Sequence, residues 1–124
     1  MRNMSKTVIA VVDDLFFASK IRGTAEQLGI NVVFAKSANA VVEASIEATP
    51  DLIIVDLHSQ RCDPIQLAQD AKANENIRSV PLLGFFSHVD TELKRRAEEA
   101  GFDQVIPRSA FSQNLGNLLQ SAVK

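Results

Sequence analysis

Four consecutive aliphatic residues at positions 52–55 end abruptly in the carboxylate of Asp56. An uninterrupted apolar run of this length is typical of a β-strand that is buried on both faces of a parallel sheet. Residues 7–12 form a second such run, which is followed directly by Asp13 and Asp14. Because parallel neighbours are joined by long crossover connections, the segments that follow these runs are expected to be helices.

Strand and helix patterns alternate five times along the chain. Strands are expected at residues 7–12, 31–35, 50–56, 80–86 and 104–107. Helices are expected at residues 15–28, 38–48, 64–74 and 91–100, with a last one after Ser109. Residues that start or stop helices flank these segments, namely Gly29, Ser37, Asp63, Pro64, Asp90, Gly101 and Ser109. Strict alternation predicts an α/β fold in which helices cover both faces of a mainly parallel sheet.

Three of the expected helices carry mostly apolar residues at helical spacing, which should face the sheet. The positions are Phe17, Ile21, Ala25 and Leu28 in the first helix, Val41, Val42, Ser45 and Ile46 in the second, and Phe111, Leu115, Leu118, Leu119 and Ala122 in the last.

Bulk composition narrows the class of protein. The chain has 124 residues, of which 46% are hydrophobic, and a net charge of −2. These values suit one globular domain over residues 1–124 and argue against disorder and against a nucleic-acid surface built from bulk positive charge. Cys62 is the lone cysteine, so an intramolecular disulfide is excluded and a reducing cytoplasm is expected. No membrane-span or signal-peptide pattern is present, so a membrane is not an expected direct partner. The small net charge likewise gives no reason to expect nucleic acid as a direct partner.

Three carboxylates are expected to meet at one edge of the sheet. The first and third strands are plausible central neighbours, so Asp13, Asp14 and Asp56 would converge where these strands end. Carboxylates this close raise one another's pKa unless a cation neutralises them. Oxygen ligands with retained water describe a Mg²⁺ site. The alternative is that these residues merely cap helices, and for Asp14 alone the two interpretations are equally plausible.

Residues 11–14, 50–56 and 100–103 resemble, in order and spacing, the CheY-like receiver domain of two-component response regulators. The resemblance covers nearly the whole chain. It implies a flavodoxin-like, five-stranded, doubly wound parallel sheet with strand order 2-1-3-4-5. It also implies that Asp56 is the phosphoacceptor of a signalling module rather than an enzyme.

The resemblance implies a set of ligands and partners as well. Mg²⁺ would be held by Asp13, Asp14, Asp56 and the backbone carbonyl of His58. A sensor histidine kinase or a phosphotransfer protein would supply the phosphoryl group. An output protein or domain would dock on the face formed by residues 91–122.

Several positions depart from the family pattern. Phe86 stands where the family has a threonine or serine, and Ser87 could supply the hydroxyl only if the loop shifts. Arg108 replaces the family's lysine and keeps the charge, but its side chain is longer and forked. We expect Arg108 to point into the acidic cluster. Phe86 is expected either to fill the switch cavity or to cover the site as a lid.

Further departures lie in the loops and in the last strand. Ser109 replaces a cis-proline, so the bond from Arg108 to Ser109 should be trans. Val105 stands at the position of the aromatic switch residue, and Ser59 and Gln60 replace a Met-Pro pair. The acidic residues of the family's site are therefore present, while both the hydroxyl and the aromatic ring of its switch are missing. The sequence predicts an atypical receiver.

Other interpretations stay open. The chain could be a pseudo-receiver, a protein-binding module whose contacts do not depend on phosphorylation. A haloacid-dehalogenase-like enzyme on a similar sheet is disfavoured, because it would need a second aspartate two residues after the first, and Asp13 and Asp14 are adjacent. A flavin enzyme is disfavoured, because the apolar residues 15–17 stand where its serine- and threonine-rich phosphate loop would be. His58 and His88 would overhang the site, where solvent-facing loop residues are a simpler account than a transition-metal site.

Overall fold

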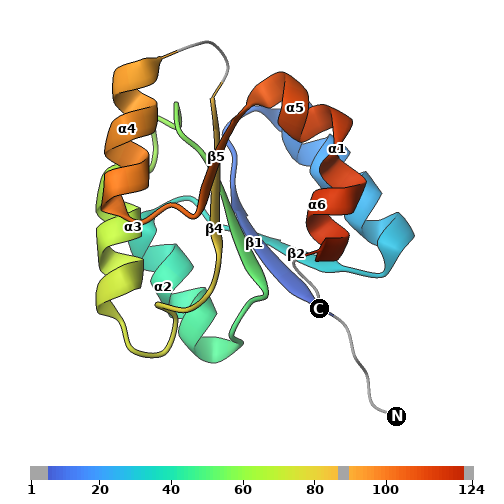
Figure 1. Cartoon of the computed structure of the whole chain (residues 1–124). Coiled ribbons are helices and arrows are strands. Elements are labelled where there is room, and N and C mark those ends of the chain that lie inside the picture. Colours follow the sequence, from blue (N-terminus) through green and yellow to red (C-terminus); the bar gives the residue numbers. More distant parts are fainter. Residues whose placement is uncertain (1–5, 87–89, 122–124) are drawn as a thin grey trace.

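Residues 6–86 and 90–121 are described by the computed structural model of this chain. Five parallel strands form one sheet in the order β2-β1-β3-β4-β5 (Figure 1). The strands are β1 (Thr7–Val11), β2 (Asn31–Phe34), β3 (Leu52–Asp56), β4 (Leu82–Phe86) and β5 (Gln104–Pro107). The helices are α1 (Leu15–Leu28), α2 (Ala38–Glu47), α3 (Pro64–Ala73), α4 (Thr91–Ala100), α5 (Arg108–Gln113) and α6 (Leu115–Ser121). The predicted doubly wound α/β fold and its strand order are confirmed.

The helices lie in two layers, with α2, α3 and α4 on one face of the sheet and α1, α5 and α6 on the other (Figure 1). Side chains of the central strands alternate between the two cores, so that Phe86 faces the first layer and Phe85 the second. Residues 52–55 are all buried, as the continuous apolar run predicts. Within the described residues, no helix is long and apolar enough to cross a membrane.

Most of the predicted helix ends are confirmed by their capping bonds. Side chains of Ser37, Asp63 and Asp90 accept hydrogen bonds from backbone amides in the first turns of α2, α3 and α4. Gly29 ends α1 in the left-handed conformation at φ 72°, which glycine adopts without steric cost. The strands β1 and β2 end one residue earlier than predicted, and β3 and β4 begin two residues later than predicted.

The C-terminal helix differs from its prediction. It begins at Arg108 rather than after Ser109, so Ser109 is no cap and lies within its first turn. Pro107 takes the N-cap position at ψ 150° and makes no side-chain capping bond. The helix is also split at Asn114, whose side-chain amide donates to the carbonyl of Ala110 at 3.0 Å. The local side-chain bond competes with the helical pattern here.

The apolar stripes were predicted correctly in part. Phe111, Leu115 and Leu119 are buried, whereas Ala122 lies outside the described residues. In α2, Val41 and Ser45 are buried, but the prediction for Ile46 is wrong because its side chain is 54% exposed. Ile46 follows Ser45 by one residue, which turns it away from the buried face of the helix.

Gly84 lies in a tightly packed part of the core. A Cβ at this position would lie 2.9 Å from Leu57 Cδ2 and 3.2 Å from Phe102 Cδ1. We expect Gly84→Ala to lower the free energy of unfolding by about 1–3 kcal/mol, as overpacking does. The matched control is Gly23→Ala within α1, where a Cβ meets nothing within 4 Å. That change should raise the free energy of unfolding by about 0.5–1 kcal/mol. Urea unfolding of both variants measures the difference, and equal midpoints would contradict it.

Candidate functional site

Asp56 ends the central strand β3, between β1 and β4. In the strand register Val11 pairs with Val55, and Asp56 pairs with Phe85. The segment that leaves β1, with Asp13 and Asp14, therefore starts from the same edge of the sheet as Asp56. The carboxylate of Asp56 is half-buried, and its Oδ1 accepts a hydrogen bond of 2.9 Å from the amide of His58.

Burial raises the pKa of the Asp56 carboxyl above its usual value, and the negative charge of Asp13 adds to the rise. The amide bond from His58 and the positive charge of Arg108 act in the opposite direction, and burial outweighs them. These influences show that Asp13, Asp56 and Arg108 share one electrostatic environment. The coupling links Asp13 to Asp56 and does not include Asp14, so the convergence of all three carboxylates stays a prediction.

Asp13 is bonded to the loop that follows β3. Its Oδ1 accepts a hydrogen bond of 3.0 Å from Ser59 Oγ, and its Oδ2 accepts one of 2.8 Å from the amide of Gln60. Ser59 and Gln60 replace the family's Met-Pro pair, and their bonds to Asp13 were not predicted. The serine hydroxyl after the acidic strand end was the one signal that could have indicated them.

Asp14 has two roles. It caps α1, since its Oδ1 accepts from the amides of Phe16 and Phe17 at 2.9 Å and 3.2 Å. Its Oδ2 pairs with Arg108 Nη2 at 2.6 Å. The Arg108 bond, followed by the amide bonds, holds the pKa of Asp14 below its usual value. The capping interpretation of Asp14 is therefore confirmed, and the carboxylate lies in the site as well.

Arg108 points into the acidic cluster, as predicted. Its guanidinium carbon lies 4.3 Å from the centroid of the Phe17 ring, so the cation rests on an aromatic face as well as on Asp14. Phe17 in turn packs against Phe85 and Phe111, with ring centroids 5.0 Å and 5.5 Å away. No cis peptide bond occurs within the described residues, so the bond from Arg108 to Ser109 is trans as expected.

Phe86 fills the core rather than covering the site. It is 6% exposed and belongs to the same buried cluster as Val105 and Ala97. Of the two predicted places for this ring, the interior one is therefore correct. Ser87 and His88 lie outside the described residues, so the predictions about them stay predictions.

Two other residues of the site region are partly or fully buried. His58 is half-buried rather than solvent-facing. Cys62 is 3% exposed and belongs to the core cluster under α2, α3 and α4. Burial, followed by the charge of Asp63, raises the pKa of the Cys62 thiol to about 11. This cysteine is a packed core residue and is protonated at neutral pH.

The acidic residues offer the right ligand chemistry for a hard cation, and Asp13 and Asp14 also accept hydrogen bonds within the chain. Among residues 6–86 and 90–121, no group of three or more histidine, cysteine or acidic side chains is arranged to hold a metal ion. Both oxygens of Asp13 and both oxygens of Asp14 already accept hydrogen bonds. Each oxygen of Asp13 and Oδ2 of Asp14 accepts a single bond, so an acceptor position remains on each of them.

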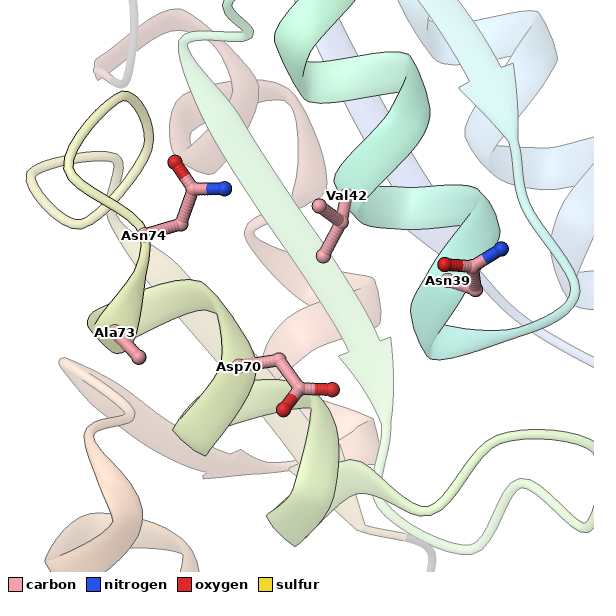
Figure 2. Close-up of a pocket in the computed structure, with 5 residues that line it drawn as sticks. All are labelled: Asn39, Val42, Asp70, Ala73 and Asn74. Atoms are coloured by element: carbon pink, nitrogen blue, oxygen red, sulfur yellow. The ribbon is translucent and has the colours of Figure 1, made fainter.

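A surface cavity of about 380 Å³ lies between α2 and α3 (Figure 2), and none of the site residues named above lines it. It is lined by Asn39, Val42, Asp70, Ala73 and Asn74. The polar side chains are occupied locally, because Asn39 donates to Glu43 and Asp70 accepts from Gln66. The site chemistry is thus at the sheet edge and not in this cavity.

Comparison with known proteins supports the fold. No protein-family model and no curated protein sequence matches the chain. Solved structures do match. The chemotaxis response regulator CheY4 of Vibrio cholerae has a TM-score of 0.81 at 18% identity, over 95% of this chain and 98% of that one. The phosphorylated cyanobacterial phytochrome response regulator RcpA has a TM-score of 0.77 at 16% identity, over 94% and 90%. The Mn²⁺-bound response regulator Rcp1 has a TM-score of 0.80 at 11% identity, over 96% and 95%.

These likenesses define the fold as that of CheY-like receiver domains, as the sequence resemblance implies. At such low identity they carry the fold alone. The roles of individual residues rest on the geometry described above.

The pKa of Asp56 leads to a prediction about stability. Because the folded-state pKa is raised above 3.8, the folded protein binds this proton more tightly than the unfolded chain. The ionised carboxylate therefore destabilises the fold above the raised pKa, and this cost is absent below 3.8. We expect Asp56→Asn to increase the free energy of unfolding at pH 7, with an advantage that shrinks as the pH falls. Denaturant unfolding between pH 4 and pH 8 measures the trend.

The opposite sign is expected for Asp14→Asn, which serves as the comparison. The folded-state pKa of Asp14 is lowered, so its stabilising contribution is present above 3.8 and is lost as the pH falls through the lowered pKa. The asparagine variant should therefore be less stable than the natural protein at pH 7. Two variants that shift in the same direction would contradict the charge distribution described here.

Proposed function

We propose that this chain is an atypical receiver that accepts a phosphoryl group on Asp56 in two-component signal transduction. The observation that carries the proposal is the arrangement at one edge of a receiver fold. Asp56 ends the central strand, Asp13 adds negative charge beside it, and Arg108 brings a positive charge from the start of α5. A nucleophilic carboxylate beside a counter-charge for phosphate oxygens is what phosphoryl transfer to an aspartate requires.

The proposed chemistry uses few groups. An ionised Asp56 oxygen attacks phosphorus in line, the new oxygen–phosphorus bond forms an acyl phosphate, and the bond to the donor's leaving group breaks. Arg108 offsets the negative charge of the phosphoryl oxygens. Mg²⁺ would be held by Asp13, Asp14, Asp56 and the backbone carbonyl of His58, and it would add positive charge at the same oxygens. The Mn²⁺ bound to Rcp1 is consistent with a divalent cation in this fold.

The partners follow from the same proposal. A sensor histidine kinase or a phosphotransfer protein would be the donor, and an output protein or domain would bind the face that contains α4, β5 and the last helices. The basic residues of α4 are largely neutralised on that face. Arg95 pairs with Glu92 and Glu99, at 2.5 Å and 2.7 Å, and Lys94 pairs with Glu98 at 3.6 Å. A partner there would meet a mixed-charge surface rather than a basic one.

A pseudo-receiver is the second candidate, and specific observations favour it. Phe86 and Val105 are both buried in one apolar cluster, where neither a hydroxyl nor a swinging ring is present to report phosphorylation. Arg108 is already paired with Asp14. A module with these features would bind its partner in one conformation, whether or not Asp56 carries phosphate.

Intact-protein mass spectrometry distinguishes the two candidates. The natural protein is incubated with acetyl phosphate and Mg²⁺, alongside Asp56→Asn and the matched control Asp70→Asn on α3, whose side chain bonds only to Gln66 among the described residues. A receiver should gain one phosphoryl group in the natural protein and in the Asp70 variant, and none in the Asp56 variant. Absence of the adduct from all three, under conditions that label a known receiver, would favour the pseudo-receiver.

A further inference from the structure

Phe17, in the first turn of α1, has the guanidinium of Arg108 over its ring. The guanidinium carbon lies 4.3 Å from the ring centroid. At this distance a cation is attracted by the negative face of an aromatic ring. Arg108 is the first residue of α5, which lies on the same face of the sheet as α1 (Figure 1). The contact therefore joins the starts of two helices beside the acidic residues.

The ring of Phe17 is a fixed platform. It is 7% exposed, and its centroid lies 5.0 Å from that of Phe85 and 5.5 Å from that of Phe111. Those two rings are fully buried and stack on each other, with planes 14° apart. Phe85 belongs to β4 and pairs with Asp56 in the register of the sheet. The platform under Arg108 is thus built on the strand that adjoins the proposed phosphoacceptor.

Arg108 keeps most of its donors available. Within the described residues its one hydrogen bond runs from Nη2 to Asp14 Oδ2, at 2.6 Å. A guanidinium has several N–H donors, so the others can bind phosphoryl oxygens while the bond to Asp14 stays in place. The positive charge of Arg108 acts to lower the pKa of the Asp56 carboxyl, so the two groups are close enough to interact. Arg108 therefore needs an orientation rather than a release.

We propose that Phe17 is a positioning residue, which orients the Arg108 guanidinium for the phosphoryl group that Asp56 accepts. Stacked on a fixed ring and bonded to Asp14, the guanidinium has little freedom to turn toward solvent. Its orientation is therefore set before the phosphoryl group arrives, which reduces the entropy lost on binding. An ammonium is strongly hydrated and has no flat face to stack. This inference rests on the proposed function and gives a reason for an arginine where the family has a lysine.

The rate at which acetyl phosphate labels Asp56 in the presence of Mg²⁺ tests the proposal. In this reaction an Asp56 oxygen bonds to phosphorus, the bond from phosphorus to the acetyl oxygen breaks, and acetate leaves. Phe17→Leu should slow labelling about fivefold, since a partly desolvated cation–π contact is lost. Phe102→Leu is the matched control, because Phe102 is 5% exposed and lies in the core on the other face of the sheet. The control should keep the rate within about twofold of the natural protein.

A double-mutant cycle separates positioning from general packing. In an Arg108→Lys background, Phe17→Leu should slow labelling by less than about twofold, because the ring stacks on a guanidinium better than on an ammonium. Equal fold-changes in the two backgrounds would overturn the proposal, since Phe17 would then act independently of the guanidinium. It would also be overturned if Phe17→Leu were labelled as fast as the natural protein.

The ¹⁵N NMR signals of the Arg108 side chain give a readout that does not depend on phosphorylation. They should shift and broaden in Phe17→Leu and stay unchanged in Phe102→Leu. Unchanged signals in both variants would contradict the orienting role of Phe17. Circular dichroism melting identifies a temperature at which the variants are folded. If Phe17→Leu melts below it, Phe17→Met fills the same space with an adaptable side chain and should show the same changes.

The two proposals can fail separately. If Asp56 is labelled in no variant while the Arg108 signals change in Phe17→Leu, the proposed function fails and the orientation of Arg108 by Phe17 stands. If Asp56 is labelled at one rate in the natural protein and in Phe17→Leu, the positioning role fails and the proposed function stands.

Discussion

Replacing Phe86 by alanine should lower the free energy of unfolding by about 3–5 kcal/mol, the range found for buried phenylalanines. Phe86 is 6% exposed and packs in the cluster that contains Val105, Ala97 and Phe102. Its removal leaves a cavity between β4 and α4 that the rigid sheet cannot close. Folded domains are typically stable by about 5–15 kcal/mol, so the variant should remain folded but be close to its limit.

Equilibrium unfolding in urea at 25 °C measures this effect. Phe16→Ala is the matched control, because Phe16 is 91% exposed and its loss should change stability by less than about 0.5 kcal/mol. A Phe86 variant as stable as the Phe16 variant would show that the ring is not part of the packed core.

The same position tests whether the conformation is locked. In the natural protein, chemical-shift changes on addition of beryllofluoride and Mg²⁺ should be confined to Asp13, Asp14, Asp56 and adjacent loops. The double variant Phe86→Thr with Val105→Tyr restores a hydroxyl and an aromatic ring, and it should spread the changes across α4 and β5. Widespread changes in the natural protein would contradict a locked conformation.

The second large effect is expected for Phe111, which packs against Phe17, the ring that contacts Arg108. We expect Phe111→Ala to lower the free energy of unfolding by about 3–5 kcal/mol, since the side chain is fully buried. Its ring stacks on Phe85 with centroids 4.7 Å apart, and it also contacts Phe17 at 5.5 Å. Such ring pairs contribute about 0.5–1.5 kcal/mol each, which is part of this loss.

Loss of Phe111 should also change the position of the Arg108 guanidinium, because Phe17 contacts both residues. The Arg108 guanidinium NMR signals should shift and broaden in the Phe111 variant as the stacked ring loses its support. Phe34→Ala serves as the comparison, since Phe34 is half-buried and lies beneath Arg22 instead. Arg108 signals that are identical in the two variants would mean that the aromatic cluster does not position the cation.

The sequence predicted those features that are local or follow from strand order. Residues 52–55 predicted a buried central strand because both faces of that strand are covered, and Asp56 marked its end. The positions of Asp13 and Asp14 followed from the pairing of β1 with β3. The match of Arg108 to the family's lysine was enough to predict that it turns toward the carboxylates.

Contacts between separate segments were not predictable in this way. The bonds from Ser59 and Gln60 to Asp13 depend on how two loops pass each other, and no spacing rule encodes that. The stacking of Arg108 on Phe17 depends on where α1 and α5 start relative to the sheet. The last helix was misplaced for a local reason, because a serine that resembles a cap is the second residue of a helix whose N-cap is Pro107.

The double engagement of Asp14 has a consequence for how any mutagenesis of this edge should be read. One carboxylate both starts α1 and anchors the residue that starts α5, so an alanine there removes a helix cap and an ion pair at once. Loss of phosphorylation in Asp14→Ala would therefore mix frayed helix ends with missing chemistry. Asparagine caps helices as well as aspartate does and carries no charge. The difference between the alanine and asparagine variants separates scaffold from site, which neither variant does alone.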